Sequence, residues 1–474
     1  MSSILWLRRD LRRSDHPALQ EAAAGGPVLP VFVIEPRLWE AAGPVRRGWL
    51  AATVLATRDA FDGRLLVRAG RPDTVLTALC GEHAVSAVHY TRETTPWAVR
   101  RDDRVAATLH ERDIDMVATG TPYAVGPGLV TRDSGQSYKV FTPFSRAWRS
   151  HGWPAPAPDP QGLQLIDGAD DTDALTTLKQ AVQDCPVPLP DAGEDAARAR
   201  WAEFLHDSIG LYDEDRDRPD LDGTSRLSPH LKVGAIHPRT LLHDLSRRRS
   251  RSADRFRTEL AWREFYADVL WRAPESAWHD MTSGMSPLYD APAHARRDAD
   301  RDSDDNAEEL VRAWQEGRTG YPLVDAGMRQ LNATGWMHNR VRMVTASFFT
   351  KDLHRWWGEG ARYFMEHLID GDLASNNHGW QWVAGTGTDA APFHRVFNPV
   401  RQGERFDPDG DYVRAWVPEL RHLNGADVHA PWKHPEGHAH GYPAPVVDHD
   451  HERRDALGRY EHVRASKADR GSQR

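Results

Sequence analysis

The sequence is poor in cysteine. Only Cys80 and Cys185 occur among 474 residues, and neither stands in a CxxC pair or has a histidine partner at metal-ligand spacing. A disulfide framework or a zinc site would need several such residues at regular spacings. We therefore expect two ordinary thiols, no disulfide and no metal ligands.

Long apolar runs are also missing. No segment approaches the ~20 consecutive apolar residues of a transmembrane helix, and the mean hydropathy is −0.64. Arg8, Arg9 and Asp10 interrupt the first apolar run, so it does not resemble a signal peptide. The sequence predicts a soluble, cytoplasmic protein that binds no membrane and is long enough for two or three domain cores.

The chain also has no excess of positive charge. The net charge is −9 and the pI is ≈ 6.2, which argues against indiscriminate coating of nucleic acid, because phosphate binding depends on clustered cations. The charge is uneven, however, with arginines in "RRRSRSADRFR" (247–257) and acids in "DADRDSDDNAEE" (298–309). Most such runs are solvated faces, but the sequence leaves room for a local basic face.

The usual nucleotide-binding fingerprints are absent from the N-terminal part. Short apolar runs alternate there with helical patterns, and neither GxGxxG nor GxxxxGK occurs. The alternation predicts an α/β domain with a doubly wound, Rossmann-like parallel sheet. The expected strands are 4–7, 28–34, 65–67, 84–90 and 114–119, and the expected crossover helices begin near Pro17, Arg46, Pro72 and Trp97. Any ligand of this domain must be held without a glycine-rich cradle.

Composition divides the chain into three regions. We expect the α/β domain at 1–130 and an interdomain linker rich in Pro, Gly, Ala and Asp at 131–200. The region 201–474 is predicted to be helical almost throughout, and it holds most of the 18 tryptophans. Its clearest helical patterns are 254–271, 321–335 and 338–360.

One helical pattern, "ELAWREFY" (259–266), brings an acid, an indole and a guanidinium onto one face. Glu259, Trp262 and Arg263 stand at positions i, i+3 and i+4. The pattern fits a ligand-binding face, and it also fits an exposed ion pair beside a core tryptophan.

A second pattern, "GWMHNRVRM" (335–343), places Asn339 and Met343 on one helix face and His338 and Arg342 on the neighbouring one. An amide beside a polarizable thioether suits a flat, partly polar ligand, although methionine often only fills a core.

The segment "DGTSRLSPHL" (222–231) follows Tyr212 and concentrates hydroxyl groups. Thr224, Ser225 and Ser228 stand at a turn and helix start, where hydroxyls and free backbone N–H groups can bind a diphosphate. The same residues are also compatible with an ordinary helix cap.

These motifs together resemble the photolyase/cryptochrome family, most closely its class I cyclobutane pyrimidine dimer photolyases. The resemblance runs from "LWLRRDLRRSDHPAL" near the start to "YPAPVVDH" (442–449). Its longest parts are "GRTGYPLVDAGMRQLNATGWMHNRVRMVTASFFTKDL" and "LIDGDLASNNHGWQWVAGTGTDAAPFHRVFNP". It implies an N-terminal α/β antenna domain and a helical domain that holds FAD in a folded conformation.

The resemblance assigns residues to the flavin. Asp370 pairs with Arg342 over the ring, Asp372 bonds the ring's polar edge, and Asn376 faces the redox-active nitrogen, where a carboxylate would repel the reduced anion. The complete implied FAD set is Tyr212, Thr224, Ser225, Arg226, Leu227, Ser228, Arg342, Asp370, Gly371, Asp372 and Asn376.

It also assigns a substrate: a pyrimidine dimer flipped out of UV-damaged DNA, repaired by an electron from light-excited reduced FAD. Trp262 and Trp382 would stack on the dimer, and Glu259 would bond its base edges and stabilise its radical anion. The implied catalytic residues are Glu259, Asn376, Trp380, Trp357 and Met343. The implied DNA contacts are Arg216, Glu259, Trp262, Arg263, Asn339, Arg340, Met343, Trp382 and Arg401. We expect a monomer.

Three alternatives remain at this stage. A cryptochrome-like blue-light receptor could retain the repair pocket. The (6-4) repair branch of the family carries a histidine where this chain has Met343. A dark flavin oxidoreductase would need a nicotinamide site, for which the N-terminal domain lacks the glycine fingerprint.

Two further expectations follow from the resemblance. The folate-binding type presents a glutamate in the stretch equivalent to 94–104, where this chain has no acid before Asp102. This favours a deazaflavin antenna over methenyltetrahydrofolate, with Asp102 as a contact. In the tryptophan relay toward oxidised flavin, Trp380 and Trp357 are present, but the slot of the exposed third tryptophan falls on Asp304.

Overall fold

The computed structural model describes residues 2–290, 301–389 and 395–472. Contacts divide the chain into two compact units. Unit 1 comprises Met1–Asp213, Thr224–Pro274 and Ile369–Ser375, and unit 2 comprises Glu214–Gly223, Glu275–Leu368 and Asn376–Arg474. Each unit thus contains segments from distant parts of the sequence, and residues 201–274 fall mostly in unit 1.

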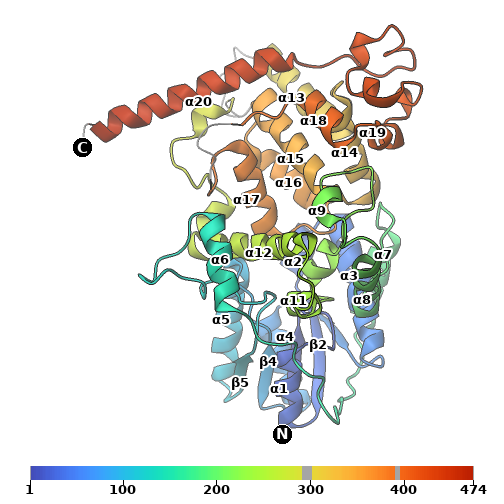
Figure 1. Cartoon of the computed structure of the whole chain (residues 1–474). Helices are drawn as coiled ribbons and strands as arrows, with labels where there is room; N and C mark the ends of the chain where they lie inside the picture. The colour runs from blue at the N-terminus through green and yellow to red at the C-terminus, as the bar shows by residue number, and fades with distance from the viewer. Residues whose placement is uncertain (1, 291–300, 390–394, 473–474) are drawn as a thin grey trace. The chain divides into compact units, whose positions relative to one another are not determined.

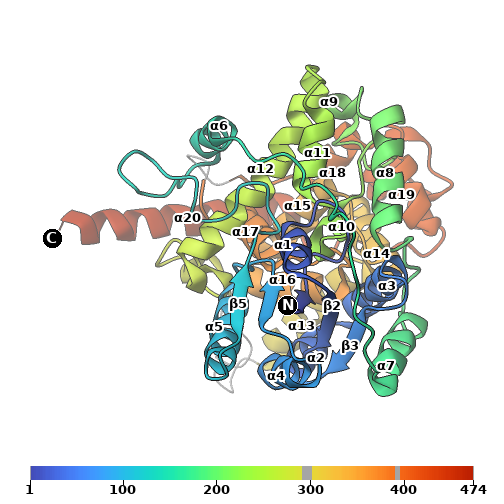
Figure 2. The same cartoon turned by 90° about the horizontal axis from the view of Figure 1, so that it is seen from below.

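Unit 1 contains the predicted parallel sheet. Its strands are β1 (Ser3–Leu7), β2 (Val28–Ile34), β3 (Leu66–Ala69), β4 (Ala87–Tyr90) and β5 (Asp115–Ala118). Their order is β3-β2-β1-β4-β5, and every neighbouring pair is parallel. Figure 2 shows β2 and β3 side by side, with β5 at the other edge. The sequence prediction is confirmed, with strand ends shifted by a few residues.

The connecting helices begin where proline fixes the first turn. They are α1 (Pro17–Gly25), α2 (Pro36–Ala41), α3 (Pro44–Ala60), α4 (Pro72–Glu82) and α5 (Pro96–His110). Proline suits the first helical position because its missing N–H would have no intrahelical partner. The side chains of Ile4 and Trp6 pack in one buried cluster with Leu76 and Leu79 of α4 and Leu109 of α5. All residues of β1 and β2 are buried, so their near-continuous apolar runs follow from burial of both sheet faces.

The other regular elements of unit 1 are helices, joined by long loops at 119–140 and 152–171. Its helices are α6 (Phe141–His151), α7 (Thr172–Gln183), α8 (Glu194–Asp207), α10 (Ser228–Val233), α11 (Pro238–Leu245) and α12 (Arg251–Arg272), and α9 (Tyr212–Asp215) lies at its border. The predicted linker therefore contains three helices. The buried carboxylate of Glu264 on α12 accepts hydrogen bonds from the backbone N–H of Ala124 and the indole of Trp148, which fixes α12 to α6 and to the loop after β5.

Unit 2 is helical (Figure 1). Its α-helices are α13 (Arg301–Glu316), α14 (Pro322–Thr334), α15 (Asn339–Ser347), α16 (Trp357–His367), α17 (Leu373–Ala384, which begins in unit 1), α18 (Pro399–Phe406), α19 (Asp411–Trp416) and α20 (His449–Ser472). Short turns are η1 (Pro274–Ala277), η2 (Ser286–Leu288), η6 (Pro418–Leu420), η7 (Gly425–His429) and η8 (Pro431–Lys433). Its core packs Trp314, Phe349, Phe364 and Trp380 together. Among the described helices of the chain, none is both long enough and apolar enough to cross a bilayer.

One predicted helix, 338–360, is wrong as a single element. The chain leaves α15 through the π-helical turn η5 (Phe348–Asp352), reaches a left-handed backbone at His354 (φ 50°), and restarts as α16 at Trp357. The reason is that this stretch buries polar side chains that need partners outside their own helix. Lys351 donates to the Arg395 carbonyl, and His354 bonds α20.

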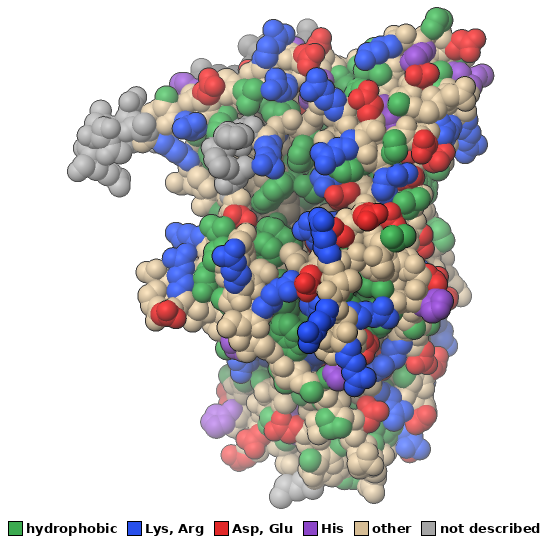
Figure 3. Space-filling model, in the orientation of Figure 1, with side chains coloured by type: hydrophobic (Ala, Val, Ile, Leu, Met, Phe, Trp, Pro, Cys, Tyr) green, Lys and Arg blue, Asp and Glu red, His purple; other side chains and the backbone are tan. Residues whose placement is uncertain are grey.

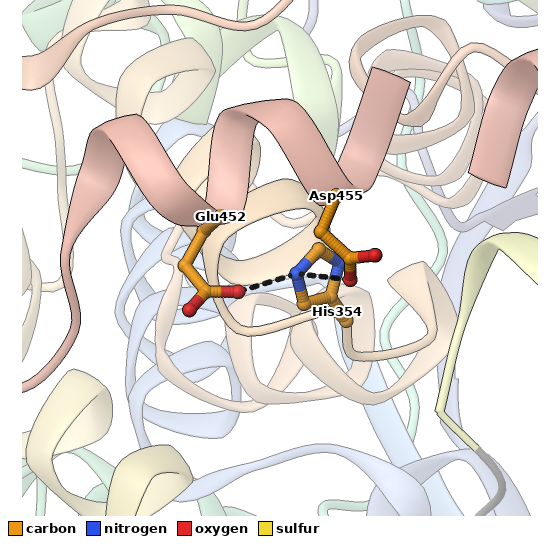
Figure 4. Close-up of side chains that lie close together, drawn as sticks. All are labelled: His354, Glu452 and Asp455. Carbon is orange, nitrogen blue, oxygen red and sulfur yellow. Dashed lines mark hydrogen bonds and ion pairs between the residues drawn. The ribbon is translucent and has the colours of Figure 1, made fainter. Parts of the chain in front are cut away.

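The contact with α20 is made by one histidine and two acids (Figure 4). The Nε2 atom of His354 lies 2.8 Å from an oxygen of Glu452 and 3.4 Å from an oxygen of Asp455, one helical turn further on. Asp455 also pairs with Arg459 at 2.8 Å. These contacts fix α20 to the irregular segment before α16.

Candidate functional site

Helix α12 carries the predicted acid–indole–guanidinium face. The indole of Trp262 is stacked on Phe141 of α6, with centroids 3.5 Å apart and planes 6° apart. One face of the indole is thus covered by the protein, and its side chain remains partly exposed. A ring held in this way can offer its other face to a planar ligand. Glu259, one turn earlier, is also partly exposed.

Arg263 has a different environment from the one predicted. Its guanidinium donates to the carbonyls of Pro122 at 2.9 Å and Leu231 at 3.1 Å and lies over the ring of Tyr123. Burial lowers the pKa of Arg263, which is satisfied by main-chain acceptors. These contacts favour a structural role for Arg263 over the predicted contact with the DNA backbone.

The main chain of the hydroxyl-rich loop, residues 222–231, is held by Arg200, which was not predicted as a site residue. Arg200 of α8 donates to the carbonyls of Thr224 at 2.9 Å and Ser225 at 3.1 Å. Arg226 has a left-handed backbone (φ 50°), and Leu227 precedes α10 as its N-cap residue. The loop is therefore held in one conformation, with its two carbonyls bound to Arg200. Helix α10 itself, which begins at Ser228, has only six residues.

Tyr212 is buried beside two phenylalanines. Its ring meets Phe204 edge to face at 5.6 Å and Phe256 at 5.3 Å. Phe256 lies on α12 and Phe204 on α8, so the start of α9 is packed against both helices.

Asp372 lies in a cluster of positive charge within unit 1. One of its oxygens lies 2.8 Å from Arg9 and 3.4 Å from Lys232, and the other accepts a hydrogen bond from the backbone N–H of Ser375 at the start of α17. Burial alone would raise the pKa of Asp372, but the charges of Lys232 and Arg9 outweigh it and hold the pKa well below its usual range. Burial and the charge of Arg9 lower the pKa of Lys232 to about 8.

Asp370 and Gly371 lie in the same segment and are buried. In unit 2, Arg342 donates through Nε to the carbonyl of Met337 at 2.7 Å. The predicted pair between Asp370 and Arg342 joins residues of the two units and stays a prediction. Arg9 and Lys232 were not predicted as site residues, although the segment "LRRDLRR" is rich in basic residues and "SPHLKVG" ends in a glycine.

Helix α15 begins with a neutral histidine cap. His338 accepts a hydrogen bond from the backbone N–H of Arg340, and burial lowers the pKa of His338 to about 4. The guanidinium of Arg340 pairs with Asp217 at 3.0 Å and lies over the ring of Phe406. Arg216 stands 3.7 Å from the same carboxylate.

The other predicted DNA contacts of unit 2 differ in exposure. Asn339 and Arg401 are exposed, and Met343 and Trp382 are partly buried against the core. The sulfur of Met343 lies 3.9 Å from Arg340.

Asn376 on α17 is oriented by its amide group. Its Nδ2 donates to the carbonyl of Ala361 on α16 at 3.0 Å and to the side-chain oxygen of Asn377 at 2.9 Å. Both N–H donors are therefore used inside unit 2. The carbonyl oxygen is the atom of this side chain that remains to meet a donor on a ligand.

Trp380 and Trp357 lie on neighbouring helices. The ring of Trp380 covers Gly360 of α16 so closely that a Cβ there would lie 2.3 Å from it. Trp357 stands one turn before Gly360 and is 1% exposed. Trp314 also approaches Trp380, with centroids 6.1 Å apart. The side chain of Asp304, at the third relay position, lies outside the described residues.

The predicted antenna contact, Asp102, is buried at the carboxyl edge of the sheet. It pairs with Arg8, which follows β1, at 2.6 Å and with Arg101 at 2.8 Å. Glu93, which follows β4 and was missed in the sequence, lies 3.2 Å from Arg101. The order of strands reverses at β1, and open parallel sheets bind ligands at such an edge.

The arginine run 247–257 is partly neutralised. Arg251 and Arg255 both pair with Asp213, at 2.6 and 3.1 Å. Arg257 pairs with Asp254 at 2.6 Å. Residues 247–249 are exposed. Figure 3 accordingly shows Lys and Arg side chains interspersed with Asp and Glu on the visible face.

The chain is similar to known proteins over nearly its whole length. Residues 3–161 match the family profile of DNA photolyase, and residues 256–462 match that of the FAD binding domain of DNA photolyase. The deoxyribodipyrimidine photo-lyase of Escherichia coli is 37% identical, with 98% of this chain and 99% of that protein covered.

Solved structures are similar over nearly the whole chain. A class III photolyase from Agrobacterium tumefaciens superposes with a TM-score of 0.85 at 35% identity, covering 98% of both chains. A cryptochrome from Synechocystis superposes with a TM-score of 0.83 at 25% identity, covering 96% of this chain and 98% of that one.

Proposed function

The chain belongs to the DNA photolyase family, and we propose that it uses light and reduced FAD to split cyclobutane pyrimidine dimers in DNA. The observation that carries this proposal is the face of α12, where Glu259 stands beside Trp262 and the indole is fixed by stacking on Phe141. A fixed ring and a nearby carboxylate match two fused bases, which offer a planar face and polar edges.

The residues fit a flavin dinucleotide in their chemistry. In unit 1, Arg200 holds the loop of Thr224 and Ser225, and the ionised carboxylate of Asp372 lies beside Arg9 and Lys232. Hydroxyls and main-chain N–H groups can bind a diphosphate, and positive charge nearby favours an anionic ligand.

Asn376 lies in unit 2, and its predicted role toward the flavin ring is part of the proposal. Because its two N–H donors are bound to Ala361 and Asn377, its carbonyl oxygen would accept a hydrogen bond from an N–H group of the ring. Reduced FAD would supply the electron to the dimer after absorbing light. The neutral amide of Asn376 adds no negative charge that would oppose the reduced ring.

Substrate binding would combine stacking with charge. Flipping a dimer from the duplex costs less than flipping a normal pair, because the lesion already disturbs stacking. Trp262 and Trp382 would receive the two bases, and Glu259 would bond their edges and stabilise negative charge on the dimer. Arg340 would reach phosphate from its position beside Asp217, since a guanidinium can bridge two acceptors.

The test uses an oligonucleotide with one cyclobutane dimer and the purified protein with reduced FAD, in blue light and in darkness. We expect repair only in light, counted by chromatography. Glu259→Gln should lower the rate by about 10²-fold, a usual contribution of one positioned group to a transition state. The exposed acid Glu111 provides a matched control, since Glu111→Gln should repair normally. Equal loss of dimer in light and darkness, or no loss in either, contradicts the proposal.

The second candidate is a cryptochrome-like blue-light receptor that retains the repair pocket. The similarity to the Synechocystis cryptochrome supports it. Such a receptor would bind FAD and respond to light in the same assay but leave the dimer intact.

The class and the antenna are part of the proposal. The pattern of Glu259, Trp262, Met343 and Asn376 supports class I, whereas the superposed Agrobacterium structure is a class III photolyase. The proposed antenna is a deazaflavin at the edge of the sheet near Asp102, whose carboxylate is paired with Arg8 and Arg101. An absorption spectrum of the purified protein tests the antenna, because deazaflavin, folate and flavin bands differ. Size-exclusion chromatography tests the expected monomer.

A further inference from the structure

A buried tryptophan of unit 2 donates its indole proton to a carboxylate. The Nε1 atom of Trp357 lies 2.7 Å from Oδ1 of Asp280, and Trp357 is 1% exposed. Asp280 lies in the segment between η1 and η2 and is partly exposed. The bond therefore connects the interior of unit 2 with a group that can reach solvent.

The environment of Asp280 makes it a stronger base than an exposed aspartate. Burial raises the pKa of Asp280, and the hydrogen bond from Trp357 lowers it by less. A carboxylate in this state holds an incoming proton more firmly. No arginine or lysine is among the main groups that set the pKa of Asp280, which are Trp357, Thr386, Tyr289 and His279.

A buried indole that loses an electron becomes a cation in an apolar core, where an unpaired charge is strongly unfavourable. It also becomes a much stronger acid than the neutral indole, because the positive charge weakens the Nε1–H bond. A carboxylate already bound to this hydrogen is placed to take it without any movement of heavy atoms.

We propose that Asp280 is the proton acceptor for Trp357 when Trp357 is oxidised. The inference rests on the proposed function, because light-driven electron transfer from Trp357 to oxidised Trp380 must occur first. Trp357 gives one electron to Trp380, which returns to a neutral indole. The Nε1–H bond then breaks, its electron pair stays on nitrogen, and the proton moves to Asp280. Trp357 becomes a neutral radical and Asp280 a carboxylic acid, so total charge is unchanged.

This step gives a reason why the relay can work with an aspartate at the third position. An exposed third tryptophan would draw the positive charge away from the flavin. With Asp304 in that slot, the positive charge would have no exposed third tryptophan to move to and could recombine from Trp357. Loss of the proton stops recombination at Trp357 itself, because the electron could then return only together with a proton.

The test is transient absorption after a light pulse on the protein with oxidised FAD. The cation and the neutral radical of tryptophan have different visible spectra. We expect the cation on Trp357 to convert to the neutral radical, more slowly in D2O than in H2O. Asp280→Asn keeps an oxygen that accepts the Trp357 hydrogen bond but cannot take a proton, so the cation should persist about 10²-fold longer or recombine.

Glu359→Gln is the matched control. Glu359 is another acid of the same region, on α16, but it pairs with Arg355 at 2.8 Å. This variant should convert like the unmodified protein, and Trp357→Phe should show no such conversion. Identical cation decay in the unmodified protein and Asp280→Asn overturns the inference, and so does the absence of any Trp357 radical.

Repair separates this inference from the proposed function. Asp280→Asn with chemically reduced FAD should repair dimers at the unmodified rate, because repair sends its electron to the DNA. Failure of the unmodified protein to repair, together with normal radical conversion, would remove the proposed function and leave the role of Asp280 intact.

Discussion

The indole rings of Trp356 and Trp357 are 5.5 Å apart between centroids and inclined by 58°. Trp357 is buried, whereas Trp356 is partly exposed at the start of α16. Trp356 is therefore the neighbour through which positive charge could leave Trp357 toward solvent.

Loss of Trp356 should matter only when proton transfer is blocked. We expect Trp356→Phe alone to change the photoreduction rate of FAD by less than about twofold, because Asp280 removes the proton first. Together with Asp280→Asn it should abolish most photoreduction, giving a strong coupling in a double-mutant cycle. Steady-state photoreduction of the four proteins measures this. Additive effects of the two substitutions would show that proton transfer to Asp280 and charge transfer to Trp356 are not alternative routes.

Trp314 should be dispensable for photoreduction. Its ring is fully buried, and its indole donates to the carbonyl of Thr345, which cannot take a proton. The tyrosine beside Trp314 is Tyr363, with ring centroids 5.6 Å apart, and burial raises the pKa of Tyr363 to about 12, so it holds its proton firmly. Trp314→Phe should therefore keep the photoreduction rate within about twofold, whereas Trp380→Phe should abolish photoreduction. A large loss in Trp314→Phe would indicate a second path.

Asn376→Asp should leave FAD bound but make its anionic reduced form harder to keep. The new carboxylate repels the reduced ring and loses the donor to the Ala361 carbonyl, a cost of about 1–3 kcal/mol if that acceptor stays unpaired. The spectrum during photoreduction should show a protonated flavin radical in place of the anion. Asn424→Asp is the control, because Asn424 is exposed in unit 2, whereas Asn377 accepts a hydrogen bond from Asn376 itself. An unchanged spectrum in Asn376→Asp would mean that Asn376 does not meet the redox-active edge.

The sequence could predict the sheet and the helices α12 and α14, because these elements depend on local periodicity. It could not predict the break after α15, since the partners of Lys351 and His354 lie 44 and 98 residues further along the chain. The roles of Arg9 and Lys232 were missed for the same reason. They meet at Asp372 through separations of 363 and 140 residues, which no spacing rule describes.

The sequence also does not show which side chains are already hydrogen-bonded within the protein. Arg263 fits the face expected for α12, yet its guanidinium is used by two carbonyls. The bond between Asp280 and Trp357 could not be predicted from a local motif, because the two residues are 77 positions apart in the sequence.

His338 should make the protein less stable as the pH falls. Its pKa is about 4 in the folded protein and 6.5 in the unfolded chain, so the unfolded chain binds more protons between pH 6.5 and 4. Stability is therefore present above pH 6.5 and is lost toward pH 4, by up to about 2–3 kcal/mol. His338→Asn keeps a side chain suited to cap α15. It should reduce the slope of the unfolding free energy against pH by the amount that one bound proton contributes. The exposed His206 is the control, and an equal change in His206→Asn would contradict the assignment.

Binding to damaged DNA should separate into a lesion-specific part and a charge-dependent part. Arg340 stands beside Met343 and Asp217 near the start of α15, and Trp262 is stacked on Phe141. Arg340→Ala and Trp262→Ala should each reduce the preference for damaged over intact DNA, by about 1–3 kcal/mol, through loss of a charged hydrogen bond or of base stacking.

The exposed arginines at 247–249 should contribute only charge to DNA binding, because an exposed cation attracts the phosphates of damaged and intact DNA alike. Their simultaneous replacement by alanine should weaken binding to both DNAs by the same factor. It should also reduce the slope of log K against log salt by about 0.9 for each phosphate that the variant no longer neutralises. Arg251 and Arg255 supply the matched comparison, because both already pair with Asp213 and their replacement should change the salt slope less. Titrations of damaged and intact duplexes at several salt concentrations decide between these outcomes. If the 247–249 variant lost lesion preference while Trp262→Ala weakened both DNAs alike, the dimer would bind elsewhere than on α12.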